Sequence, residues 1–326
     1  MTAPFVRTVL GDIAPPELGV TYSHEHVFIG PSRAVDRFPH LLLDDVDAMV
    51  RELAGPVALG LRAVVDGMPV DAGRDVLALA DISRRARIHV VAPTGLHHDR
   101  YYGPDHWSER IGVDELAELF VADIMDGIDA DDHAGPTVRR TGHRAGVIKI
   151  AGSEGGPSPR DARVFEAAAI AHARTGAPIL THCEHGTGGL GQVALLERHG
   201  VASAHVVLSH TDKVVDPGYH RELLATGATL EYDGSFRGDD APGPTLSLIE
   251  AMVADGLGGQ LVLGHDAARR TYLSVYGGRP GLSWLLGEFS ARMRDRGIPG
   301  PTIEGFFVAN PARAFAFATT AEGPAA

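Results

Sequence analysis

The sequence predicts an α/β fold, and within that class a (β/α)8 TIM barrel. Three observations support this prediction. Short runs rich in Val, Ile and Leu alternate with longer amphipathic stretches along the chain. The short runs are apolar almost throughout, which is typical of strands that are buried on both faces. Histidine, lysine and aspartate residues, which are unusual in such apolar runs, stand near their ends, where a barrel places its functional side chains.

Eight runs are strand candidates, and they lie at residues 20–27, 62–67, 88–94, 146–151, 177–183, 204–210, 228–233 and 260–266. Helices are predicted for the amphipathic stretches at residues 43–53, 114–125, 161–175, 188–199, 217–225, 244–254 and 282–296. A barrel of this kind typically takes about 250 residues and grows by loop insertions. The chain of 326 residues is long enough for eight such units.

The main alternative is a doubly wound open sheet. Such a sheet concentrates its binding residues at one switch point, whereas a barrel collects polar side chains from the carboxyl ends of many strands. Here the unusual polar residues stand at the first, fourth, fifth, sixth and eighth runs, which favours the barrel. Because no low-complexity linker and no repeat of about 20 to 50 residues divides the sequence, we expect a single domain over residues 1–326.

Composition narrows the partners and the compartment. The formal net charge of -13, from 29 basic and 42 acidic residues, argues against a nucleic-acid or anionic-membrane partner. No apolar stretch approaches the roughly 18 residues of a membrane span. Cys183 is the single cysteine, which excludes an intramolecular disulfide, and the N-terminus has no signal-peptide pattern. We expect a cytoplasmic protein that acts on a small molecule.

The first strand candidate ends in the motif His24-Glu25-His26. Residues i and i+2 of a strand point to the same side, so both imidazoles can face the barrel mouth and hold one metal ion while Glu25 turns away. Three further runs carry a potential metal ligand at or next to their last residue, namely His182, His210 and Asp266. Each alone is consistent with a hydrogen-bonded core residue. Together they form a ligand set at the C-terminal face of the strands, and imidazole with carboxylate suits zinc, manganese, cobalt or iron.

Lys149 stands near the end of the fourth run. A lone ammonium inside a barrel is costly to bury unless it is paired or neutralised. One alternative is an ion pair with a nearby acid. The other is carbamylation by dissolved carbon dioxide, which reverses the charge of the side chain and supplies two oxygens that can bridge two metal ions. We expect the carbamylated form of Lys149, and with it two divalent metal ions per chain.

These motifs resemble those of the phosphotriesterase-related family in the amidohydrolase superfamily. The similarity runs over nearly the whole chain, through Gly11-Asp12, Leu18-Gly19-Val20-Thr21, His24-Glu25-His26, Val147-Ile148-Lys149, Thr181-His182, Ser209-His210, Gly264-His265-Asp266, Tyr276-Gly277-Gly278 and Asn310-Pro311. The resemblance implies a homodimer with a binuclear centre. From the imidazole and carboxylate ligands we expect the two ions to be zinc. It assigns the ligands as His24, His26 and Asp266 on a buried metal, His182 and His210 on a more exposed one, and carbamylated Lys149 with a hydroxide between both.

The resemblance implies a metal-dependent hydrolase that uses the bridging hydroxide as nucleophile and Asp266 as proton shuttle. Members of the family hydrolyse lactones, organophosphate triesters and some N-acyl amino acids. We therefore expect a lactonase or carboxylic ester hydrolase. The alternatives within the family are an organophosphate triesterase and an N-acyl amino acid amidohydrolase.

Basic loop residues give a hint about the substrate. Arg237 follows the seventh strand candidate, and Arg269, Arg270 and Tyr272 follow the eighth. An arginine fork suits phosphate or carboxylate, so these residues could bind a phosphorylated or carboxylated lactone. They could equally be solvated loop charges.

Three rival functions remain. A Schiff-base aldolase would use Lys149 as its nucleophile, but it leaves four histidines and Asp266 unexplained. A mononuclear deaminase of the same superfamily would not need Lys149. A catalytically silent barrel would serve as a scaffold, although an intact ligand set argues against it.

Overall fold

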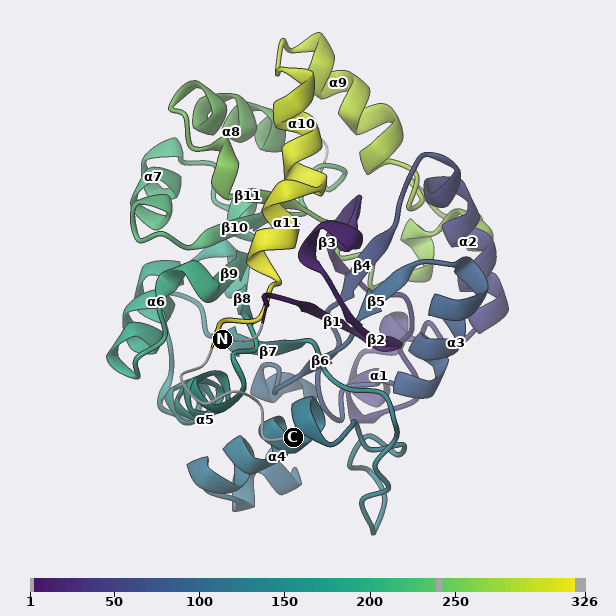
Figure 1. The fold of residues 1–326 in the computed structure, drawn as a ribbon, viewed down its shortest axis with the longest axis vertical. Coiled ribbons are helices and arrows are strands. Elements are labelled where there is room, and N and C mark those ends of the chain that lie inside the picture. Colours follow the sequence, from purple (N-terminus) through teal and green to yellow (C-terminus); the bar gives the residue numbers. More distant parts are fainter. Residues whose placement is uncertain (1–2, 239–241, 320–326) are drawn as a thin grey trace.

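The computed structural model describes residues 3–238 and 242–319 and shows a barrel of parallel strands surrounded by helices (Figure 1). Its wall consists of β3 (Thr21–Glu25), β4 (Ala63–Asp66), β5 (His89–Val91), β6 (Pro93–Thr94), β7 (Val147–Gly152), β8 (Ile179–Cys183), β9 (Val206–Ser209), β10 (Thr229–Tyr232) and β11 (Leu261–Leu263). Only Ala92 separates β5 from β6, so these two pieces form one interrupted strand. Each of the eight predicted runs contains part of this wall, which confirms the predicted α/β barrel.

The strands of the wall pair in chain order, and every pair is parallel. Strands β3, β4 and β5 form one sheet, and β6 to β11 form the other. At the seam between the first and last strands, the N–H groups of His265 and Asp266 donate to the carbonyl oxygen of His24 over 3.2 and 3.0 Å. This contact places the residues that follow β11 directly beside the end of β3.

Helices cover the outside of the wall. The longer ones are α2 (Val46–Ala58), α3 (Val76–Ala86), α4 (Val113–Met125), α5 (Pro159–Thr175), α6 (Gly189–Arg198), α7 (Pro217–Ala225), α8 (Gly243–Ala254) and α10 (Gly300–Phe307), and the shorter ones are α1 (Arg33–Arg37), α9 (Ser290–Asp295) and α11 (Ala309–Ala314). The predicted helix at residues 282–296 is in fact a π-helical turn at Leu285–Phe289 that continues into α9. Among residues 3–238 and 242–319, no helix has the length and hydrophobicity needed to cross a membrane.

Local sequence sets the ends of these helices, as α5 shows. Ser158 precedes the helix, and its hydroxyl oxygen accepts a hydrogen bond from the backbone N–H of Asp161 over 3.1 Å. Pro159 occupies the first turn, where its missing N–H costs nothing. Gly176 ends the helix with φ 76°, a left-handed conformation that glycine adopts without strain.

The barrel interior is apolar at one end and polar at the other. The apolar end is a cluster of buried side chains that includes Val6, Leu18, Ala63, Val65, Val91, Val147, Leu180, Val207, Val262 and Phe315. The antiparallel pair β1 (Val6–Thr8) and β2 (Gly11–Ile13) crosses this end together with α11 (Figure 1). Lys149 lies two residues after Val147 on β7 and so takes the next inward position. The polar end is therefore the C-terminal face of the strands.

Candidate metal centre

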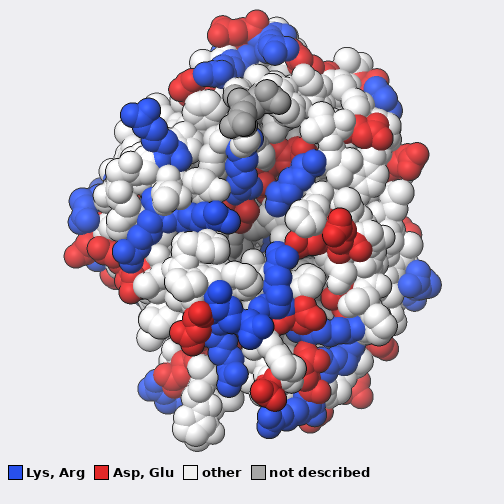
Figure 2. Space-filling view, turned by 180° about the vertical axis from the view of Figure 1, so that it is seen from behind, with Lys and Arg blue, Asp and Glu red and all other residues white. Residues whose placement is uncertain are grey.

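A pocket of about 260 Å³ opens at the C-terminal ends of the strands. Figure 2 shows this face, on which acidic and basic side chains surround a central hollow. The pocket wall contains five of the six predicted ligands, His24, His26, His182, His210 and Asp266. The sixth, Lys149, is fully buried. The structure thus brings together side chains that lie on β3, β8, β9 and β11 or within three residues of their ends.

One group within the pocket joins His24, His26 and Asp266. The Nε2 atom of His26 lies 3.0 Å from Oδ1 of Asp266, and Nε2 of His24 lies 3.8 Å from the same oxygen. Asp266 adopts φ 49°, a left-handed conformation that is uncommon outside glycine and that often marks functional sites. Gly67 leaves room for His24, since a Cβ at that position would lie 2.5 Å from Nε2 of the imidazole. These three side chains are close enough to share one ion.

The imidazoles of His182 and His210 form the neighbouring group. Their ring centroids are 4.4 Å apart, and the ring of His210 is 4.9 Å from that of His24. Burial lowers the pKa of His24 and of His182 well below the usual value for histidine, and it also lowers the pKa of His210. At neutral pH these rings are therefore uncharged, which is the form that binds a metal ion.

Lys149 has few partners for a buried amine. Its Nζ donates one hydrogen bond, to Oγ of Ser209 over 3.4 Å. Burial lowers the pKa of Lys149 to about 8, although the carboxylates of Asp266, Glu231 and Asp233 oppose this shift. A pKa this close to neutrality leaves a substantial fraction of the amine unprotonated. The unprotonated amine is the form that can react with carbon dioxide.

Two carboxylates that the sequence reasoning missed complete the cluster. Glu231 on β10 and Asp233 just after it are fully buried. With His24 and His210 they form a second group whose potential ligand atoms all lie within 4.8 Å of one another. Asp233 Oδ2 is hydrogen-bonded to Nδ1 of His210, and burial raises the pKa of Glu231 well above its usual value. A signal for Glu231 was present, because a charged residue inside an apolar strand is as unusual there as Lys149 is on β7.

Three of the four predicted substrate-binding residues line the pocket, namely Arg237, Arg269 and Tyr272. Arg237 reaches inward, with Nη2 3.0 Å from Oδ2 of Asp266. Arg270 does not line it, because its guanidinium bonds to Asp44 over 2.8 Å and stacks on the ring of Tyr276. The geometry therefore separates Arg269 from Arg270, which the sequence left equivalent.

Other pocket residues come from loops whose role the sequence did not settle. His97 and Tyr101, which follow β6, line the wall together with Lys213, which follows β9. The ring of His97 lies 4.9 Å from that of His182. Glu184 bridges two loops, since one oxygen lies 2.8 Å from Nε2 of His182 and the other accepts a 2.7 Å bond from Arg100. The mouth of the pocket is thus strongly polar.

A closed barrel with imidazole and carboxylate groups clustered at its C-terminal face is the architecture of a metal-dependent hydrolase. A sequence model of the Phosphotriesterase family matches residues 4–315, and the chain belongs to this family of binuclear metal hydrolases. It is 31% identical to the phospho-furanose lactonase of Mycoplasmopsis synoviae, over 97% of this chain and 93% of that protein.

Two further comparisons agree. The chain is 31% identical to the phosphotriesterase homology protein of Escherichia coli, over 91% of this chain and 98% of that protein. A crystal structure of a lactonase from Listeria monocytogenes superposes with a TM-score of 0.89 at 31% identity. The superposition covers 97% of this chain and 100% of the lactonase chain. The chain is therefore similar over nearly its full length to hydrolases with lactonase names.

Proposed function

We propose that this protein is a lactonase that hydrolyses a small lactone with an anionic substituent, most closely a phosphorylated furanose lactone. One observation carries the proposal: Arg237, Arg269 and Tyr272 line the same pocket as the five histidine and aspartate side chains of the candidate metal centre. An anionic group can bind at Arg269 and Tyr272 while the ring faces the centre, and Arg237 bonds to Asp266 beside it. The name of the Mycoplasmopsis synoviae relative supports the same substrate class.

The proposed centre holds two zinc ions. Its proposed ligands are His24, His26 and Asp266 for one ion, His182 and His210 for the other, and carbamylated Lys149 for both. The residues fit such ions, because the Nδ1 atoms of His24 and His26 are buried without a hydrogen-bond partner among the described residues. Burial also keeps three of the imidazoles neutral. When bound, the ions would polarise the lactone carbonyl and make a water molecule more acidic.

The side chains of the pocket perform the remaining steps. Asp266 accepts a proton from the attacking water, and the new C–O bond forms at the carbonyl carbon. The ring C–O bond then breaks, and Asp266 returns the proton to the departing ring oxygen, so that a hydroxy acid is released. Arg237 holds the Asp266 carboxylate in place, while Arg269 and Tyr272 at the pocket mouth bind the anionic group.

Triester hydrolysis is the second candidate, since the chain belongs to the Phosphotriesterase family. The pocket disfavours it, because a volume of about 260 Å³ with histidine, arginine and lysine in its wall suits a small charged molecule better than a bulky apolar triester.

A homodimer in the cytoplasm stays a prediction, and light scattering of the purified protein checks the dimer.

A matched pair of substrates tests the proposal. Zinc-loaded protein is assayed with a furanose lactone that carries a terminal phosphate and with the same lactone without it. We expect kcat/KM to be about 10- to 100-fold higher for the phosphorylated lactone, because a hydrogen bond to a charged group contributes roughly 1.5–3 kcal/mol. Equal values for the two lactones would show that the anionic group is not recognised. Turnover of triesters alone would favour the second candidate.

Metal content and borohydride treatment separate the rival functions. About two ions per chain favour the binuclear centre, and one ion favours a mononuclear deaminase. Borohydride with a carbonyl substrate would trap a Schiff base on Lys149 in an aldolase, whereas a carbamylated lysine cannot be trapped.

A further inference from the structure

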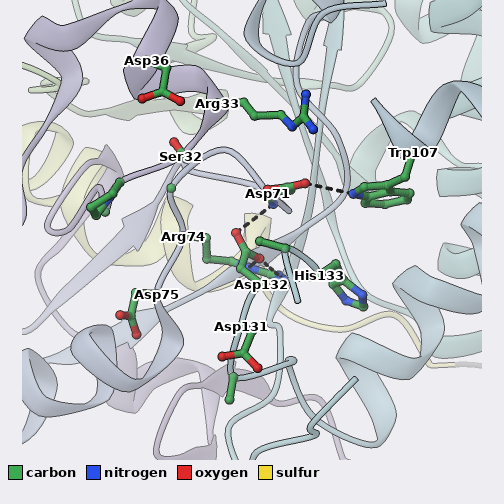
Figure 3. A pocket seen from close by; sticks show the side chains of 15 residues that line it. Ser32, Arg33, Asp36, Asp71, Arg74, Asp75, Trp107, Asp131, Asp132 and His133 are labelled. Atoms are coloured by element: carbon green, nitrogen blue, oxygen red, sulfur yellow. Dashed lines mark hydrogen bonds and ion pairs between the residues drawn. The ribbon is translucent and has the colours of Figure 1, made fainter. Parts of the chain in front are cut away.

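A second cavity, of about 470 Å³, is lined by loops that also contribute to the wall of the catalytic pocket. Figure 3 shows its lining side chains. The cavity is lined by residues that follow β3 and β4, by Trp107 in the segment after β6, and by residues 130–134 between α4 and β7. The same loops supply Met68 and Tyr101 to the catalytic pocket, yet no residue lines both cavities. We name this second cavity the Asp71 cavity, after the carboxylate in its wall.

The Asp71 side chain is more than nine-tenths buried, with 9% exposed. Its Oδ2 accepts hydrogen bonds from Nε2 of His106 over 2.8 Å and from Nε1 of Trp107 over 2.9 Å. Nδ1 of His106 accepts a hydrogen bond from the backbone N–H of Ser108 over 3.3 Å, so Nε2 is the ring nitrogen that faces Asp71. Among the described residues, no donor bonds to the other oxygen of Asp71, Oδ1, and no arginine or lysine nitrogen lies within 4.0 Å of its carboxylate.

Three other acidic groups of the cavity already have partners. Asp132 pairs with Arg74 over 2.6 Å, and Asp131 pairs with Arg139 over 2.6 Å. Asp75 accepts two backbone N–H bonds at the start of α3. Burial raises the pKa of Asp132 to about 8, and the charge of Asp71 adds to this shift against the opposing effect of Arg74. Asp36, at the exposed rim, has no basic partner within 4.0 Å among the described residues, so the unpaired acidic groups of the cavity are Asp71 inside it and Asp36 on its rim. A buried charge without a counterion is unfavourable.

Two further side chains define what could neutralise that charge. The indole of Trp107 is fixed by its bond to Asp71 and lines the cavity, so it can contact a cation through its ring. Arg33 stands at the exposed rim, and in Figure 3 it lies on the same side of the cavity as Asp71 and Trp107. No carboxylate of the described residues lies within 4.0 Å of the Arg33 guanidinium. A buried carboxylate without an arginine or lysine partner and a rim guanidinium without a carboxylate partner thus belong to the same cavity.

We propose that the Asp71 cavity binds a small zwitterion of the amino acid type. Its primary ammonium group bonds to Oδ1 of Asp71 beside Trp107, and its carboxylate bonds to Arg33 at the rim. A single free oxygen suits a compact ammonium donor better than a planar guanidinium, which needs two acceptors. The cavity volume of about 470 Å³ accommodates such a molecule.

A chain of hydrogen bonds connects the Asp71 cavity to the catalytic pocket. The hydroxyl of Tyr102 accepts a bond from the backbone N–H of His97 over 2.8 Å and donates to the carbonyl of Val70 over 3.0 Å. Val70 directly precedes Asp71, and His97 is a wall residue of the catalytic pocket. A ligand at Asp71 therefore lies one residue from a hydrogen-bonded link between the two cavities.

Calorimetric titration with three matched probes tests the proposal. The probes are 4-aminobutanoate, which has both charges, and butylammonium and butanoate, which each have one. We expect 4-aminobutanoate to bind with a dissociation constant at least tenfold below that of butylammonium, and butanoate to show no saturable binding. Glycine and lysine extend the series to shorter and longer molecules. Failure of all the zwitterions to bind, or equal binding of butanoate, overturns the proposal.

Variants then locate the binding site. Asp71→Asn keeps the shape of the side chain, and we expect it to weaken 4-aminobutanoate binding at least tenfold. Asp71 also holds His106 and Trp107, so Arg33→Gln provides a second variant at an exposed position. We expect the Arg33→Gln protein to bind 4-aminobutanoate only as tightly as it binds butylammonium. Asp47→Asn, at an exposed ion pair outside the cavity, is the matched control and should bind as the parent does. Unchanged binding in Arg33→Gln, or loss of binding in Arg269→Ala of the catalytic pocket, overturns the assignment.

Discussion

The imidazole of His26 and the carboxylate of Asp266 lie 3.0 Å apart, although 240 positions separate them in the sequence. His26 follows the first strand of the barrel wall, β3, and Asp266 follows the last, β11. Two backbone hydrogen bonds to the carbonyl of His24 hold the ends of these strands together. The proposed centre therefore depends directly on closure of the barrel, and Asp266 occupies the seam.

Replacing Asp266 by asparagine tests its proposed role in proton transfer. Asp266→Asn keeps the size of the side chain but removes its basicity, so we expect kcat for the best lactone to fall by about 10²- to 10⁴-fold. Much of the metal should remain, because five proposed ligands are intact. Metal analysis and steady-state kinetics on the same preparation measure both. Asp255→Asn, at an exposed carboxylate paired with Arg221, is the control. Undiminished turnover in metal-replete Asp266→Asn would refute the assignment.

Removing the buried amine tests whether Lys149 bridges two ions. Lys149→Met keeps a long side chain but cannot be carbamylated, so we expect the metal content to fall from about two ions per chain to one or fewer. The parent protein should regain metal and activity faster when bicarbonate is added, since only the neutral amine reacts with carbon dioxide and the pKa of Lys149 is lowered to about 8 by burial. Full metal content in Lys149→Met, with reconstitution insensitive to bicarbonate, would contradict the carbamylated bridge.

Two adjacent arginines offer a matched test of substrate binding. Arg269 lines the catalytic pocket, whereas Arg270 bonds to Asp44 outside it. We expect Arg269→Ala to raise KM for a phosphorylated lactone by about 10- to 100-fold, because one charge-assisted hydrogen bond is lost. KM for the neutral lactone should stay nearly unchanged. Arg270→Ala should leave both values as they are, and a larger effect there than at Arg269 would reverse our assignment of the two residues.

Much of the barrel could be predicted from the sequence because its strands are buried on both faces. Continuous apolar runs of this kind stand out, and the polar residues at their ends stand out even more. The helix α3 was not predicted, and the predicted stretch at 282–296 contains a π-helical turn at Leu285–Phe289. The α3 segment does carry a local helix signal that the prediction overlooked, because Asp75 caps it and Val76, Leu79, Ala80 and Ser83 are buried at helical spacing. No such local pattern marks the π-helical turn.

The finer details of the two cavities depend on contacts between distant loops. Nothing in the sequence distinguishes Arg269 from Arg270, because the conformation of the loop after β11 decides which guanidinium points inward. The partners of Asp71 come from residues 106 and 107, and Asp132 bonds to its backbone N–H over 2.8 Å. Such a site appears only once the loops are placed. Glu231 was predictable in principle, since it is a charged residue within an apolar strand.

A buried network at the side of the barrel predicts how stability depends on pH. Asp123 is fully buried and bonds to Arg74, Arg140 and Thr94. Burial alone would raise its pKa, but Arg74, His133 and Arg140 outweigh that effect and lower the pKa to about 2. The folded state therefore favours the carboxylate, so the stabilisation is complete above about pH 4 and is lost as the pH falls toward 2.

We expect Asp123→Asn to lower the free energy of unfolding at pH 7 by about 3–5 kcal/mol, because the buried Arg74 and the partly exposed Arg140 lose a counterion. The difference between parent and variant should shrink by about 2 kcal/mol between pH 4 and pH 2. Urea unfolding across this range measures it, with Asp47→Asn at an exposed ion pair as the control. A difference that stays constant with pH would mean that Asp123 does not act through its charge.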